Sequence, residues 1–157
     1  MEISFPFDAH DLGGVPDRRY SSADVAAVAR LLFSNGVLGT NGLKITAGTG
    51  LAVEAAPGGA VIDGRFYALD TAKTLPIEPN TSGNDRIDAV VLRLDHAARA
   101  IYPTVIAGTP AAQPERPSPL CTDAVHDILL AAVLVPNACE SIGAGYVTAL
   151  ATPAAGI

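Results

Sequence analysis

The sequence has no tryptophan and is poor in cysteine, aromatic residues and basic charge. Of its 157 residues, two are Cys and 5% are aromatic. So few thiols cannot form a disulfide framework or a four-thiolate metal site, and so few rings make a poor stacking platform for bases or sugars. Ten Lys and Arg against sixteen Asp and Glu leave a net charge of −6. That sign argues against nucleic acid or an anionic membrane as a partner.

Long hydrophobic runs are also missing. The longest, residues 128–136, is about half the length that a membrane-spanning helix needs. The N-terminus shows no basic region followed by an apolar one, so no signal peptide is indicated. We therefore expect a soluble protein made in the cytoplasm, without membrane insertion. Asn80-Thr81-Ser82 fits a glycosylation sequon, but without a secretory signal it predicts only a turn.

One amphipathic helix is predicted near the N-terminus. Ser21 or Ser22 can cap it, and Asp24 follows Ser21 at the spacing of a capping box. An apolar stripe then runs at i, i+3, i+4 and i+7 through Val25, Val28, Ala29 and Leu32. The pair Asn35-Gly36 tolerates positive φ and is expected to end the helix. The pattern predicts a helix over residues 22–34.

Strand patterns follow the helix. Alternation across residues 51–55 predicts a half-buried strand, which Pro57-Gly58-Gly59 is expected to break. Asp63-Gly64 lies between two β-prone segments, residues 60–62 and 65–69. Since Asp-Gly favours a two-residue turn with positive φ at both positions, this segment predicts a hairpin.

The second half of the chain contains one long strand pattern. Residues 86–95 are apolar on both faces in the middle, which is typical of a central strand, and residues 100–107 are expected to return as its partner. Residues 75–77 contain a proline and predict an edge strand. Residues 108–119 hold four prolines and predict an extended surface loop. Residues 127–135 fit a buried strand or a helical segment, and their short length before a proline favours the strand.

Together the patterns predict a mainly β fold. We expect an antiparallel sandwich or barrel of roughly seven short strands, preceded by one N-terminal amphipathic helix. Residues 1–36 would form an N-terminal arm and helix for assembly or docking, and residues 37–150 the antiparallel β domain. Residues 151–157 would be a tail without pattern.

No catalytic or metal-binding constellation can be identified. His10, His96 and His126 are far apart and lack the spacing of metal ligands. The one cluster compatible with a Cys–His nucleophile is Cys121, His126 and Asp127, and no local motif supports it. We therefore expect no catalytic residue and no metal site.

The carboxylates around the long strand do not predict an acid–base pair. Asp85 and Asp88 are three residues apart and would point to opposite faces of a strand. A simpler role for them and for Asp95 is charge pairing with the arginines of that region, Arg86, Arg93 and Arg99. No glycine-rich phosphate loop or dinucleotide fingerprint occurs, so no cofactor is expected. A core without a site is more typical of a structural or binding module.

An ordered series of motifs runs through most of the chain. Asp17-Arg18-x-Tyr20-x-x-x-Asp24 opens the predicted helix, and Asn35-Gly36-Val37 follows it. The later motifs are residues 41–47, 57–67, 84–95, 108–114 and 130–135. In this order the series, over about residues 5–150, resembles tail-tip and baseplate proteins of tailed phages. These proteins are related to the N-terminal particle-docking modules of receptor-binding proteins and tail fibres.

The resemblance implies a homo-oligomer, most often a trimer, at the tail end of a virion. It would be made in the host cytoplasm and contact other tail or baseplate proteins. Family members usually continue into a long receptor-binding region, whereas the recognisable strands here stop near residue 150. An adaptor for a partner chain, a self-contained tip protein and part of a longer protein remain open. The primary hypothesis is a structural component of a phage tail tip or baseplate that presents or connects receptor-binding parts.

Two sets of residues follow from these hypotheses. The candidates for an assembly interface lie on the helix stripe: Val25, Val28 and Leu32. Packing of that stripe on the protein's own sheet is an equal alternative. The alternative function is a carbohydrate-binding module that recognises a host surface glycan or receptor, which needs an exposed aromatic shelf supplied by Phe66, Tyr67 and Tyr102. A hydrolase using Cys121 or His126 is a distant third.

Overall fold

The computed structural model describes residues 13–16 and 19–156. In this part of the chain one α-helix, α1 (Ser22–Leu32), precedes the strands, and a 3₁₀ turn, η1 (Ala144–Tyr146), lies before the last strand. The strands are β1 (Gly36–Leu38), β2 (Ile45–Ala47), β3 (Ala52–Ala55), β4 (Gly58–Ile62), β5 (Arg65–Leu69), β6 (Lys73–Pro76), β7 (Arg86–Asp95), β8 (Ala100–Ile106), β9 (Val125–Val135) and β10 (Val147–Ala149). The prediction of a mainly β fold with one helix near the N-terminus is confirmed.

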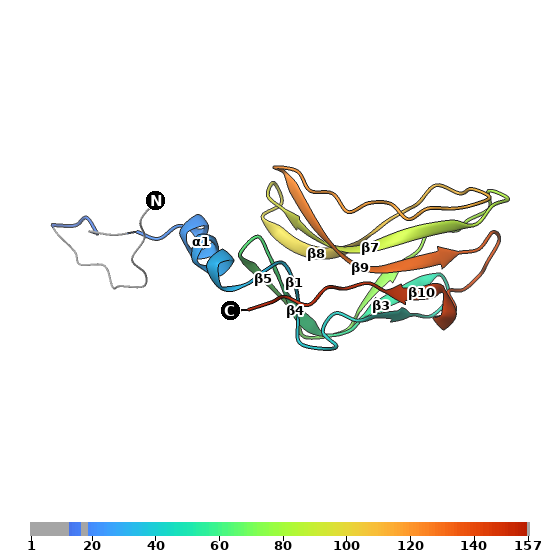
Figure 1. The fold of residues 1–157 in the computed structure, drawn as a ribbon, viewed down its shortest axis with the longest axis horizontal. Coiled ribbons are helices and arrows are strands. Elements are labelled where there is room, and N and C mark those ends of the chain that lie inside the picture. The colour runs from blue at the N-terminus through green and yellow to red at the C-terminus, as the bar shows by residue number, and fades with distance from the viewer. Residues whose placement is uncertain (1–12, 17–18, 157) are drawn as a thin grey trace.

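The strands form three antiparallel sheets that enclose one core. The largest sheet has the order β10-β9-β7-β8, and the two smaller ones have the orders β1-β4-β5 and β2-β3-β6. Figure 1 shows β7, β8 and β9 on one side of the molecule and β1, β3, β4 and β5 on the other. The hydrophobic core between them takes side chains from all three sheets, including Val53, Ile62 and Leu92. The arrangement is a sandwich, since each sheet has a linear strand order and does not close into a barrel.

β7 is the central strand that the sequence predicts. It pairs with β9 over its whole length and with β8 over residues 89–95. Val90 and Leu92 point into the core, and Ala89 and Val91 on the opposite face are also fully buried. Burial on both faces is the reason for its near-continuous apolar sequence. The predicted strands on either side are confirmed as β8 and β9.

The β4–β5 hairpin also matches the prediction. Asp63 and Gly64 join the strands with φ of 48° and 71°. Both values are positive, as a two-residue hairpin turn of this kind requires. A side chain at Gly64 would collide with the carbonyl oxygen of Ala26, so the turn lies directly against α1. The hairpin therefore connects the helix to the β domain.

The capping box of α1 is confirmed, but its end is not where the sequence predicts it. Ser21 and Asp24 exchange hydrogen bonds in both directions at the N-terminus. The helix then ends at Leu32, and its cap, Phe33, is extended with φ of −135°. No positive-φ residue is needed, because the chain leaves the helix directly to pair with the C-terminal segment.

The tail that lacks a pattern in sequence is ordered by this pairing. Ser34 N–H donates to Ala155 O at 2.9 Å, and Val37 exchanges backbone hydrogen bonds with Thr152 and Ala154 at 2.9 and 2.8 Å. Figure 1 accordingly shows the C-terminus near α1. The division of the chain into an arm, a β domain and a patternless tail therefore misses a contact between its first and last parts.

The strand of residues 51–55 ends at Ala55, as predicted, but the two glycines after Pro57 already begin the next strand. Gly58 and Gly59 belong to β4 and pair with β5. A Cβ at Gly58 would lie 2.5 Å from the Cα of Gly42, so the glycine allows two backbones to approach closely. Leu75, in the predicted edge strand, lies in β6, which is at a sheet edge.

A buried ion pair anchors the start of β7. Arg86 Nε donates to Asp88 Oδ1 at 2.7 Å, and the side chains are 7% and 1% exposed. Arg86 Nη2 also donates to Glu78 O at 2.7 Å, and Gly108 N–H donates to Asp88 Oδ1 at 2.9 Å. The pair thus connects β7 to the segment after β6 and to the start of the proline-rich loop. The predicted charge pairing is confirmed for Arg86.

Arg93 pairs with a residue that the sequence does not indicate. Its Nε and Nη2 donate to the two carboxylate oxygens of Asp127 at 2.8 and 2.9 Å. Leu120 N–H donates to the same carboxylate at 3.1 Å. Asp127 therefore connects β7, β9 and the end of the proline-rich segment, which is a loop as predicted.

The sequon asparagine lies in a turn, as predicted. Asn80 is 2% exposed, and its Nδ2 donates to the carbonyl oxygens of Val135 and Asn84 at 2.9 and 2.8 Å. Its amide nitrogen is therefore occupied in holding the turn to the end of β9.

Candidate functional site

The helix α1 leaves much of its apolar stripe uncovered. Its buried residues are Ala26 and Ala29, and Val28 is half-buried. Val25 and Leu32 are 44% and 42% exposed. Packing on the protein's own β domain therefore accounts for only part of the stripe.

Leu31 extends this uncovered surface, although it lies outside the apolar stripe that the sequence predicts. It is 77% exposed and lies three residues after Val28, so the two side chains are neighbours on the helix. We call Val25, Val28, Leu31 and Leu32 the helix strip.

The attachment of α1 to the β domain is largely polar. Arg30 Nη1 lies 3.2 Å from Asp63 Oδ1, with the two side chains 45% and 36% exposed. Asp63 N–H donates to Asn35 Oδ1 at 2.7 Å. Phe33 and Phe66 add an edge-to-face ring contact with centroids 5.8 Å apart. These contacts hold the helix at one end of the β domain, where Figure 1 shows it projecting from the sandwich.

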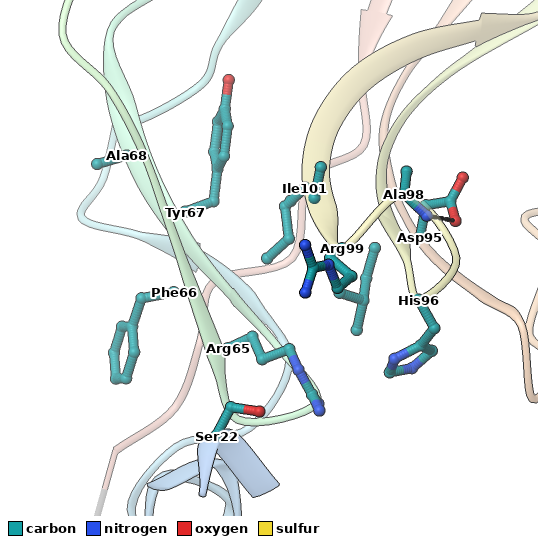
Figure 2. A pocket seen from close by; sticks show the side chains of 12 residues that line it. Ser22, Arg65, Phe66, Tyr67, Ala68, Asp95, His96, Ala98, Arg99 and Ile101 are labelled. Atoms are coloured by element: carbon teal, nitrogen blue, oxygen red, sulfur yellow. Dashed lines mark hydrogen bonds between the residues drawn. The ribbon is translucent and has the colours of Figure 1, made fainter.

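A groove of about 830 Å³ lies between β5 and the turn that joins β7 to β8. Arg65 and Tyr67 line it from β5, and His96, Arg99 and Ile101 line it from the other wall. Figure 2 shows the side chains of Arg65 and Arg99 extending into the space between these walls. The groove, which we call the β5 groove, brings together residues that are about thirty positions apart in the sequence.

The cations of the β5 groove are incompletely paired. Arg65 Nη1 is shared with Asp63 O and Oδ2 at 3.2 and 3.3 Å. Among the described residues, the guanidinium of Arg99 has neither a hydrogen-bond nor an ion-pair partner. The expectation that Arg99 pairs with a nearby carboxylate is therefore wrong, because the turn points its side chain toward β5.

Asp95 lines the same groove but is already hydrogen-bonded. Its Oδ1 accepts from Ala98 N–H at 2.9 Å, and its Oδ2 accepts from the Tyr102 hydroxyl at 3.2 Å. The Ala98 bond and, to a lesser degree, the Tyr102 bond hold the pKa of Asp95 below its usual value. The carboxylate points away from β5 in Figure 2.

The three predicted ligand-contact aromatics do not form one shelf. Phe66 and Tyr67 are adjacent on β5 and point to opposite faces, with Phe66 56% exposed beside Phe33. Tyr102 contacts Asp95 instead of facing β5. Burial raises the pKa of Tyr67, so its hydroxyl stays protonated at neutral pH. Only Tyr67 presents its ring between the two walls of the groove.

The Cys–His cluster is brought together only in part. Cys121 and His126 face each other in an isolated β-bridge. Asp127 points to the other face of β9 and is bound by Arg93, while His126 Nε2 lies 3.3 Å from Asn35 Nδ2. The carboxylate therefore cannot orient the imidazole toward the thiol. Asp85 and Asp88 are likewise separated, the first exposed and the second buried, as their spacing predicts.

The described residues, 13–16 and 19–156, contain no group of three His, Cys, Asp or Glu side chains that could hold a metal ion. His10, one of the histidines considered above, lies outside them. In the same part of the chain no helix has the length and apolar character needed to cross a bilayer.

Comparison with known proteins finds no matching family model, no matching curated protein and no matching solved structure. The features of the chain that bear on its function are therefore the sequence motifs, the helix strip and the β5 groove.

Proposed function

We propose that the protein is a structural component of a phage tail tip or baseplate, an oligomeric adaptor that docks on the tail and presents or connects receptor-binding parts. The observation that carries the assembly part of this proposal is the exposed helix strip on α1. The phage setting rests on the resemblance of the ordered motif series. In this function the chain acts mechanically, without a catalytic step, at the tail end of a virion.

The helix strip supports assembly for two physical reasons. Contiguous exposed valine and leucine side chains on one helix face are typical of a surface that a partner covers. In addition, α1 has eleven residues, a length at which a helix gains most of its stability from packing. Helices of several copies that meet around a symmetry axis bury such strips against one another.

A symmetric ring also explains what the adaptor does. The proposed trimer holds three receptor-binding parts at fixed spacing, so weak individual contacts gain avidity through their high effective concentration. Other tail or baseplate proteins bind the remaining surface of the β domain.

The proposal is tested first by the mass of the purified chain in solution, measured by light scattering for the wild type and for Val25→Glu. We expect a trimer that dissociates in the variant, because an interface that covers position 25 would bury an unpaired carboxylate. Val25 lies near the N-terminus of α1, where an acidic side chain is compatible with the helix dipole, so the variant keeps its helix.

Ala23→Asp is the matched control. Ala23 is exposed on α1 outside the helix strip, and the substitution adds the same charge, so we expect the trimer to remain. A wild type that stays monomeric at every concentration, or a trimer that Val25→Glu leaves intact, would contradict the assembly role. Failure of labelled protein to bind isolated phage tails would contradict the tail-docking role separately.

A further inference from the structure

The β5 groove presents positive charge from two walls. The Arg99 guanidinium is unpaired within the described residues, and Arg65 uses one terminal nitrogen for Asp63 while its other nitrogens are left without a partner there. His96 adds a third nitrogen-bearing side chain at the turn. The chain as a whole has a net charge of −6, so the basic side chains of the β5 groove differ in sign from the overall charge.

The same groove has an apolar surface beside the cations. Tyr67 and Ile101 lie on opposite walls, and both are partly buried against the hydrophobic core. The Tyr67 hydroxyl can donate or accept a hydrogen bond. A hollow of this volume that combines several polar groups with apolar surface from Tyr67 and Ile101 can hold a small polar ligand.

We infer that the β5 groove binds an acidic saccharide, whose carboxylate lies between Arg99 and Arg65 and whose sugar ring packs on Tyr67. Arginine suits this role because its planar fork donates two parallel hydrogen bonds to a carboxylate. The ring hydroxyls of a sugar can exchange hydrogen bonds with the Tyr67 hydroxyl and with the imidazole of His96. This inference goes beyond the assembly role, since binding in the groove does not depend on the helix strip.

Asp95 is the one carboxylate on the groove wall, and its position limits its repulsion of an anionic ligand. Both its oxygens accept hydrogen bonds, from Ala98 and Tyr102. Its carboxylate points away from β5, whereas the guanidinium of Arg99 is turned toward β5 (Figure 2). The ligand carboxylate therefore meets the arginines before it meets Asp95.

The inference is tested by calorimetric titration with tetragalacturonate, with a glucuronate tetrasaccharide and with sialyllactose. We expect at least one of them to bind, and Arg99→Gln to weaken that binding by about tenfold or more, because a hydrogen-bonded charge pair is lost. Arg99 is exposed and unpaired among the described residues, so the variant keeps the fold. Arg99→Lys keeps the charge without the fork and should bind at an intermediate level.

Lys73→Gln is the matched control, since it removes the same charge from an exposed position on β6 and should leave binding unchanged. The inference is overturned if none of the three acidic saccharides binds or if Arg99→Gln binds as the wild type does. It is also overturned if neutral maltotetraose, tetraglutamate or inorganic phosphate binds as tightly as the acidic sugars. Equal binding of maltotetraose would show that the carboxylate is not recognised. Equal binding of tetraglutamate or phosphate would show that the sugar is not recognised.

Discussion

The strand β7 and the helix α1 are both rich in apolar residues, yet they differ in how much of their apolar surface is buried. β7 is covered on both faces, and its ion pair, Arg86–Asp88, is almost fully buried. α1 buries two alanines and leaves Val25, Leu31 and Leu32 exposed, and its ion pair, Arg30–Asp63, is open to solvent. The comparison indicates that β7 contributes strongly to the stability of the domain, whereas α1 leaves apolar surface uncovered within one chain.

The largest expected effect comes from breaking the buried ion pair. Asp88→Asn leaves the guanidinium of Arg86 buried without a counter-charge, which should reduce the free energy of unfolding by about 3–5 kcal/mol. Asp63→Asn is the matched substitution in the exposed pair and should cost about 1 kcal/mol or less. Asparagine also tolerates the positive φ at that position. Urea denaturation of both variants measures the difference, and equal losses would contradict the contrast between the two regions.

The next prediction compares the loss of stability when a buried leucine of β7 and an exposed leucine of α1 are each replaced by alanine. Leu92 is fully buried in β7, so Leu92→Ala should cost about 3 kcal/mol, from lost burial and from the cavity it leaves. Leu31 on α1 is 77% exposed, so Leu31→Ala should change stability by about 0.5 kcal/mol or less when the copies are dissociated. Denaturation at low protein concentration makes this comparison. A loss for Leu31→Ala that matches the loss for Leu92→Ala would show that the helix strip is covered within one chain.

The smallest effect concerns the start of α1. Ser21→Ala removes the N-cap hydroxyl and should cost about 1 kcal/mol at neutral pH. The N-cap bond from Asp24 N–H to the Ser21 hydroxyl does not depend on the charge of Asp24. The backbone N–H of Ser21 and, second, its hydroxyl lower the pKa of Asp24 below 3.8, so the stabilisation from these two bonds to the carboxylate is present above pH 3.8 and is lost as the pH falls through the lower, folded pKa.

Titration by NMR measures the same contact directly. The pKa of Asp24 should lie below 3.8 in the wild type and rise toward it in Ser21→Ala, which keeps the backbone hydrogen bond. An unchanged pKa would mean that the hydroxyl does not contact the carboxylate in solution.

Local patterns in the sequence predict the elements that local physics decides. Asp63-Gly64 specifies a turn whatever surrounds it, and the apolar run of residues 86–95 requires cover on both faces. The capping box likewise depends only on residues three apart. Strands of three residues, such as β1, β2 and β10, carry too few side chains to show a period and so cannot be predicted from local pattern.

The candidate site is predictable to a smaller extent. The helix stripe can be predicted from the sequence because its spacing is helical. The sequence does not predict which residues of the stripe the β domain covers. The β5 groove has no sequence pattern, since Arg65 lies on β5 and Arg99 lies in the turn between β7 and β8 of another sheet, and the two meet only through packing. An arginine in a turn predicts nothing until its neighbours are known.

The amino-acid sequence by itself determined the antiparallel β character, the capped helix, the hairpin and the central strand, because each follows from contacts between residues close in the chain or from alternation along it. Only the tertiary structure decided that the C-terminal segment pairs with the chain after α1, that Arg93 takes Asp127 as its partner, and that Arg65 and Arg99 share a groove. Those outcomes depend on how the three sheets pack around one core. Packing brings together residues that are distant in the sequence, and no local sequence pattern predicts such contacts.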